Sequence, residues 1–86
     1  MTFDEIIAAV ETELKFARDK FPSNKHLLHA FTEEAGEVTK AFLDNAVGKC
    51  ESSHIRKELV QAIAMAVRLL QAVSYTHLTL PTNREV

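Results

Sequence analysis

Three glutamates stand close together within an otherwise apolar segment of the chain, residues 32–38. Residues three and four apart are neighbours on an α-helix, so Glu34 lies beside Glu37, and Glu33 also lies beside Glu37. Like charges at this spacing repel each other, and a divalent cation bound between them removes the repulsion. Carboxylate oxygens are the ligands that Mg²⁺ prefers, usually together with the phosphates of a substrate. The segment therefore indicates either a metal site or a charged helix face in contact with solvent.

A second pair of polar residues has the same spacing further along the chain. Glu58 and Gln61 are three residues apart on the next expected helix. A short connection between antiparallel helices would set this pair opposite Glu34 and Glu37. The four side chains would then offer oxygen ligands to Mg²⁺, with Mn²⁺ as the second choice. On the pattern alone, ordinary surface acids are the alternative interpretation.

These two segments resemble the motifs of a known family. Residues 29–38 read HAFTEEAGEV and residues 56–62 read RKELVQA, and both resemble the MazG-like, all-α nucleoside triphosphate pyrophosphohydrolases. That family carries Glu-x-x-Glu on one helix and Glu-x-x-Asp on the next, and Glu34, Glu37 and Glu58 fit these motifs. The resemblance covers roughly residues 3–72. It implies Mg²⁺-dependent hydrolysis of an NTP or dNTP to the monophosphate and pyrophosphate, by dimers or higher oligomers of helical bundles.

The second motif departs from the family at one position, because Gln61 stands where the family has Asp. An amide oxygen still binds a hard cation but brings no charge, so we expect weaker Mg²⁺ binding or a relaxed dependence on it. The first hypothesis is a nucleotide pyrophosphohydrolase, and phosphoribosyl-ATP pyrophosphatase, from the same superfamily, stays open. The alternative hypothesis is a non-catalytic helical dimerisation or interaction module of the same fold.

Other charged residues are candidates for parts of the reaction. Glu33 or Glu37 would orient the attacking water, and the sequence does not choose between them. Arg68 and Lys25 are candidates for contacts to the substrate phosphates. Arg68 is the stronger of the two because it shares one strip of its helix with Glu58 and Gln61, although a contact between these residues would be a structural alternative.

Three long helices must position these residues. We expect helices from residue 3 to 21, from about residue 25 to Gly48, and from about residue 54 to 73, with Pro22 ending the first. Helix-capping side chains precede each of them: Thr2 with Glu5, then Ser23 or Asn24, then Ser52 or Ser53. The pattern predicts an all-α fold, an antiparallel bundle of three long helices. The resemblance to the MazG-like family implies that this bundle is a truncated four-helix unit.

Apolar stripes predict which face of each helix enters the core. The stripes are Phe3, Ile7, Val10, Leu14, Ala17 and Phe21, then Leu27, Phe31, Ala35, Val38 and Phe42, then Ile55, Leu59, Ile63, Ala66, Val67 and Leu70. Glu34 and Glu37 fall on the shoulder of the second stripe. Glu13 is predicted to face solvent, and Phe16 is expected in the core in preference to stacking on a base. The wide apolar face of the third helix predicts a homodimer or a higher homo-oligomer.

Composition limits the remaining classes of function. The chain has 86 residues and a net charge of −2, which predicts one small domain without an electrostatic surface for nucleic acid. The sequence contains no apolar run of about 18 residues, so no membrane span is expected. The single cysteine favours a reducing compartment, the cytoplasm. Residues 73–86 lose the helical pattern and look like translated vector sequence, so we expect a domain over 1–72 followed by a non-native or disordered tail.

Overall fold

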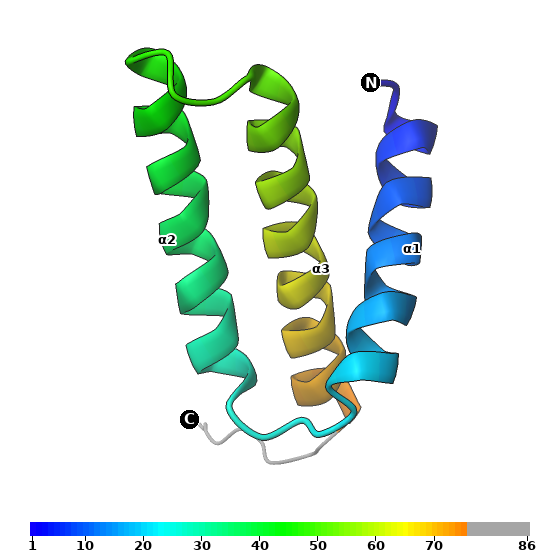
Figure 1. Ribbon diagram of the computed structural model, residues 1–86. Helices are drawn as coiled ribbons and strands as arrows, with labels where there is room; N and C mark the ends of the chain where they lie inside the picture. Colours follow the sequence, from blue (N-terminus) through cyan, green and yellow to red (C-terminus); the bar gives the residue numbers. More distant parts are fainter. Residues whose placement is uncertain (76–86) are drawn as a thin grey trace, which may run out of the picture.

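The computed structural model describes residues 1–75, which form three α-helices and no strand. The helices are α1 (Phe3–Lys20), α2 (Leu27–Ala46) and α3 (Ser52–Tyr75). α1 and α3 run in the same direction and α2 runs in the opposite one (Figure 1). The predicted all-α fold is confirmed. α3 continues past the expected domain end at residue 72, and residues 76–86 of the expected tail lie outside the described residues.

Local signals at the helix ends explain two of the boundaries. The capping box of α1 is present: the Thr2 hydroxyl accepts from the Glu5 backbone N–H at 3.1 Å, and the Glu5 carboxylate accepts from the Thr2 N–H at 2.7 Å. α2 ends just before Gly48, whose φ of 77° is the left-handed conformation that favours glycine. Ser52 is already inside α3, so the third helix begins two residues earlier than predicted.

The predicted cap of α2 is wrong. The helix begins after His26, which has a φ of 63°, and no side chain caps its first turn. Ser23 instead accepts a hydrogen bond from the Lys25 backbone N–H at 3.1 Å. Residues 21–26 therefore form a loop that crosses from the end of α1 to the start of α2 (Figure 1).

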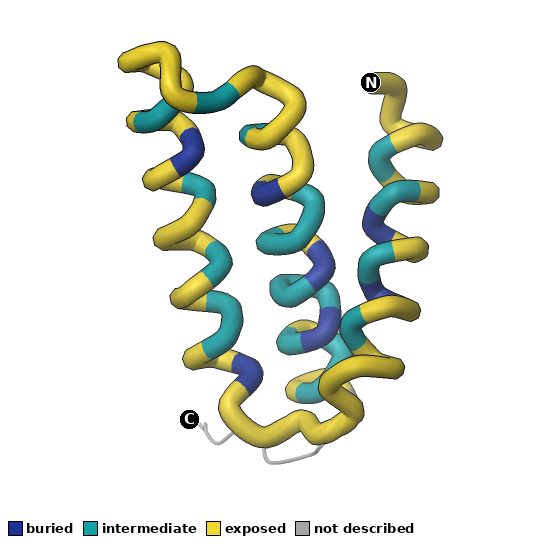
Figure 2. The backbone as a smooth tube through the Cα atoms, in the orientation of Figure 1, coloured by how far each residue is buried: buried dark blue, intermediate teal, exposed yellow. Residues whose placement is uncertain are grey.

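α3 is the central helix and packs against both α1 and α2, which do not pack directly against each other. Against α1 it forms the main apolar cluster, where Val10 and Leu14 meet Ala64. On α2, Ala41 is the most completely buried of the described residues, with 1% of the residue exposed. Small side chains at a helix contact let the two backbones approach closely. The core is consequently small and divided between the two sides of α3 (Figure 2).

The apolar stripes predicted the inward faces only in part: Val10, Leu14 and Leu27 are buried as expected, and other stripe residues are exposed. On α2, Ala41 is buried while Phe42 is exposed, and on α3, Arg68 is buried while Leu59 and Leu70 are exposed. α3 is apolar around most of its circumference, so its periodicity alone does not select the face that α2 covers. α2 covers the polar strip that contains Glu58. A third face of α3 carries exposed apolar residues: Leu59, Ile63, Leu70 and Val73.

No helix within residues 1–75 is long and apolar enough to span a membrane.

Candidate metal centre and adjoining pocket

α2 and α3 bring three carboxylates together. One oxygen atom from each of Glu34, Glu37 and Glu58 lies within 4.8 Å of the others. A tight connection between the helices sets this register, because Asn45 donates to the Cys50 carbonyl at 3.0 Å and the Cys50 thiol donates to the Ala41 carbonyl at 3.4 Å. The two segments that the sequence singled out therefore meet across one antiparallel helix pair.

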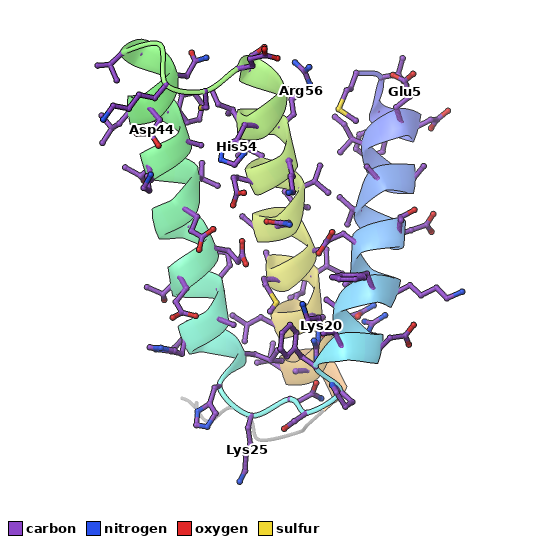
Figure 3. The ribbon with its side chains drawn as sticks, viewed as in Figure 1. Glu5, Lys20, Lys25, Asp44, His54 and Arg56 are labelled. Carbon is purple, nitrogen blue, oxygen red and sulfur yellow. The ribbon has the colours of Figure 1, made fainter. Side chains whose placement is uncertain are left out.

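Burial makes this cluster different from a surface acidic patch. The Glu58 side chain is buried, with 6% of the residue exposed. Within the described part of the chain, Glu34 Oε1 and Glu58 Oε1 are buried and have no hydrogen-bond partner. His54 Nε2 lies 3.9 Å from Glu58 Oε2. Figure 3 shows His54 and Asp44 towards the connection between α2 and α3, at one end of the gap.

The donor set fits a hard divalent cation. Buried carboxylate oxygens without partners cost free energy, and a cation bound between them removes that cost. Oxygen donors suit Mg²⁺ or Mn²⁺. Gln61 is half-buried and lies one turn beyond Glu58, where it lines a pocket together with Glu34. These side chains could hold the ion, and Gln61 could add a neutral oxygen ligand.

The cluster disfavours ionisation when no cation is present. Burial raises the pKa of Glu34, and the negative charges of Glu37 and Glu58 raise it further. Burial also raises the pKa of Glu58, and a hydrogen bond with Glu37 acts in the same direction. Desolvation and like charge are two of the general causes of a raised carboxyl pKa. A cation bound between the carboxylates would lower the pKa values of Glu34 and Glu58 again, because it favours their charged forms.

In the metal-free protein, we expect the acidic cluster to contribute more to the free energy of unfolding at about pH 5 than at about pH 7. The pKa values of Glu34 and Glu58 are raised above the ordinary 4.5 in the folded state. At a pH between the ordinary pKa and the raised pKa, the folded state therefore binds more protons than the unfolded state. The free energy of unfolding therefore falls as pH rises through this window. Urea unfolding in the presence of a chelator measures this contribution, as the difference between the wild type and Glu58→Gln.

The Glu58→Gln comparison is needed because other groups titrate in the same range. Asp44 is paired with Lys40 at 2.7 Å, and this hydrogen bond holds the pKa of Asp44 below its usual value. The Asp44 contribution to stability is lost on acidification, so it opposes the effect of the cluster. Identical pH slopes in the wild type and in Glu58→Gln would contradict the prediction.

A pocket of about 380 Å³ adjoins the cluster, between α1 and α2 and over α3. We call it the α1–α2 pocket. Glu34 of α2 and Gln61 of α3 line the end of the pocket beside the cluster. Phe16 of α1, Phe21 and Leu27 line it towards the loop between α1 and α2. A volume of this size is within the usual range for small-molecule sites. The pocket therefore offers carboxylate and amide groups at the acidic end, and both aromatic rings and cationic side chains at the loop end.

The two candidate phosphate contacts lie at the loop end of the pocket. Arg68 is 4% exposed, and its Nη2 donates to the Ser23 carbonyl at 3.1 Å and to Asn24 Oδ1 at 3.2 Å. The contact with Glu58 or Gln61 that the shared strip suggested is not among the hydrogen bonds of residues 1–75. Lys25 is exposed at the pocket. Their role towards phosphates remains a prediction.

The two candidate catalytic glutamates differ in their surroundings. Glu33 is exposed at the α1–α2 pocket, and its carboxylate lies 3.7 Å from His29 Nε2. Glu37 is an exposed residue of α2 and belongs to the acidic cluster. Of the two, Glu37 is therefore the one next to the oxygens that would hold the cation.

Two predictions about α1 are wrong. Phe16 and Phe21 were expected in the core, and they are 56% and 61% exposed and line the pocket. Glu13 was expected to face solvent, and it is half-buried at the same pocket. The available signal was the spacing of Glu13, Phe16 and Ala17, which places all three on adjoining parts of one helix face.

Comparison with known protein families, with curated proteins and with solved structures finds no match to this chain.

Proposed function

We propose that this protein is a Mg²⁺-dependent nucleotide pyrophosphohydrolase that cleaves an NTP or dNTP to the monophosphate and pyrophosphate. The observation that carries the proposal is the convergence of Glu34, Glu37 and Glu58 from two helices, with buried oxygen atoms that lack partners. The pocket beside the cluster supports a substrate with a charged end and an apolar, planar end. The resemblance of both motifs to the MazG-like enzymes agrees with this chemistry.

The side chains divide the work as follows. Glu34, Glu37 and Glu58 would hold the cation, which when bound offsets the negative charge of the phosphates and makes phosphorus more open to attack. Glu37 is placed to orient a water molecule and accept its proton, with Glu33 as the second candidate. Burial of the Glu58 side chain strengthens the electrostatic interaction of its carboxylate with a bound cation.

The proposal includes assembly into a homodimer or a higher homo-oligomer, and a cytoplasmic location. The exposed apolar residues on the third face of α3, Leu59, Ile63, Leu70 and Val73, support assembly because a second copy would remove them from water. Sedimentation at micromolar concentration tests this part, and a monomeric mass would count against it. The single cysteine, Cys50, is free, as expected in a reducing compartment.

The alternative function is a non-catalytic dimerisation or interaction module of the same fold. Gln61 favours this alternative, since the cluster has three carboxylates where four are expected. The exposed face of α3 is compatible with both functions. A protein of this second class would release no pyrophosphate from any nucleotide, and Mg²⁺ would leave its melting temperature unchanged.

Pyrophosphate release over a panel of NTPs and dNTPs with Mg²⁺ separates the two functions. In the same assay we expect Gln61→Asp to increase Mg²⁺-dependent turnover by about tenfold, because a charged ligand replaces a neutral one. Gln71→Asp is the matched control, since it adds the same charge on α3 beside Arg18 and away from the cluster. If neither the wild type nor Gln61→Asp releases pyrophosphate, and Mg²⁺ does not change the melting temperature, the proposed hydrolase function is wrong.

A further inference from the structure

α1 contributes a carboxylate to the α1–α2 pocket that the proposed hydrolysis does not use. Glu13 and Phe16 line the pocket from α1, and Phe21 follows at the start of the loop. α1 runs parallel to α3 and antiparallel to α2 (Figure 1). Positions along the pocket therefore follow the chain: Glu13 lies at the end where Glu34 is found, and Phe21 lies at the end where Leu27 is found.

The Glu13 carboxylate has no protein partner in the described residues. It is half-buried, and no hydrogen bond or ion pair within residues 1–75 involves it. Its negative charge contributes to the raised pKa of Glu34, so the two carboxylates are close enough to interact. An ionised carboxylate only accepts hydrogen bonds and repels phosphate. A ligand would have to offer Glu13 a hydrogen-bond donor such as a hydroxyl group.

The opposite end of the pocket suits a planar aromatic group. The rings of Phe16 and Phe21 are exposed, and the Lys20 ammonium lies 5.6 Å and 5.5 Å from their centroids. The ammonium group lies over these rings, and both rings also line the pocket, where a base could stack on them. A nucleotide with its phosphates at the acidic cluster and its base at these rings would have its sugar in the part of the pocket that Glu13 lines. In this orientation Arg68 and Lys25, at the loop end, would lie beside the base and not beside the phosphates.

We propose that Glu13 accepts hydrogen bonds from the hydroxyl groups of the substrate's ribose, so that ribonucleotides are preferred over deoxyribonucleotides. This inference rests on the proposed function. A ribose offers two adjacent hydroxyls to the two oxygens of the carboxylate, and a deoxyribose offers only one. Because hydrogen bonds to a charged group are among the stronger ones, the loss of one reduces kcat/KM by about 10- to 100-fold.

The test compares ATP with dATP and GTP with dGTP in the pyrophosphate-release assay. The wild type should prefer the ribonucleotide of each pair by at least about tenfold. Glu13→Ala should bring the ratio close to one, and Glu13→Gln should lie between because its amide oxygen still accepts a hydrogen bond. Glu11→Gln is the matched control on an exposed position of α1. A loss of structure alone would lower turnover of both nucleotides without changing their ratio.

The outcomes distinguish this inference from the hydrolase itself. Equal turnover of each pair by the wild type, or an unchanged ratio in Glu13→Ala, overturns the role of Glu13 and leaves the hydrolase standing. If no nucleotide is hydrolysed, titration calorimetry with AMP and 2′-deoxy-AMP decides instead. Tighter binding of AMP that is lost in Glu13→Ala supports the sugar site without the hydrolase, whereas equal affinities or no binding overturn it.

Discussion

We expect replacement of Glu58 by Gln to lower the proposed Mg²⁺-dependent pyrophosphate release by about 100-fold or more and, in the absence of metal, to raise the melting temperature. Glu58→Gln keeps the shape of the side chain and removes its charge. The wild-type carboxylate is buried, has an oxygen without a partner and lies beside Glu34 and Glu37. Removing the charge relieves both the desolvation and the repulsion, so the folded state gains stability while the cation loses a ligand.

Opposite signs for stability and activity are what separate a metal site from a structural carboxylate. Thermal unfolding monitored by circular dichroism, with a chelator and then with Mg²⁺, measures the first quantity, and the pyrophosphate assay measures the second. Glu11→Gln removes an acid from an exposed position and should change neither. A lower melting temperature for metal-free Glu58→Gln would show that the carboxylate stabilises the fold. Full activity of this variant would show that Glu58 is not part of the metal site.

Replacing Arg68 by Ala destabilises the protein by about 2–3 kcal/mol. The buried side chain joins α3 to the loop between α1 and α2, through the Ser23 carbonyl and Asn24 Oδ1. Truncation removes these hydrogen bonds and leaves a cavity where the long side chain packed. Arg68→Met restores most of the volume without the hydrogen bonds, so it should recover part of the loss. Urea unfolding gives all three free energies.

Arg56 provides the control, because it is an arginine on the same helix and is exposed. Arg56→Ala should change the free energy of unfolding by no more than about 0.5 kcal/mol. The Arg68 variants also decide between the two roles considered for this residue. If Arg68→Ala unfolds at the wild-type urea concentration and loses only pyrophosphate release, the guanidinium acts on substrate phosphates instead of holding the loop.

The features that could be predicted from the sequence are those that depend on neighbours along the chain. Three helices, the capping box at Thr2 and the stop at Gly48 follow from propensity and local hydrogen bonding. The meeting of Glu34 and Glu37 with Glu58 also follows, because a tight connection between antiparallel helices leaves few registers. The start of α2 was not predictable in this way, since no side-chain cap defines it.

The sequence by itself determined the helices and the acidic pairs, whereas only the tertiary structure decided how each helix is rotated. α3 offers apolar or small side chains on several faces, so α1 and α2 could cover different pairs of them at similar cost. In the packed structure Ala41 and Glu58 are buried and Leu59 is exposed. The same rotation opens the pocket that Glu13 and Phe16 line. Burial of the carboxylates, and hence their need for a cation, is therefore a property of the packed helices.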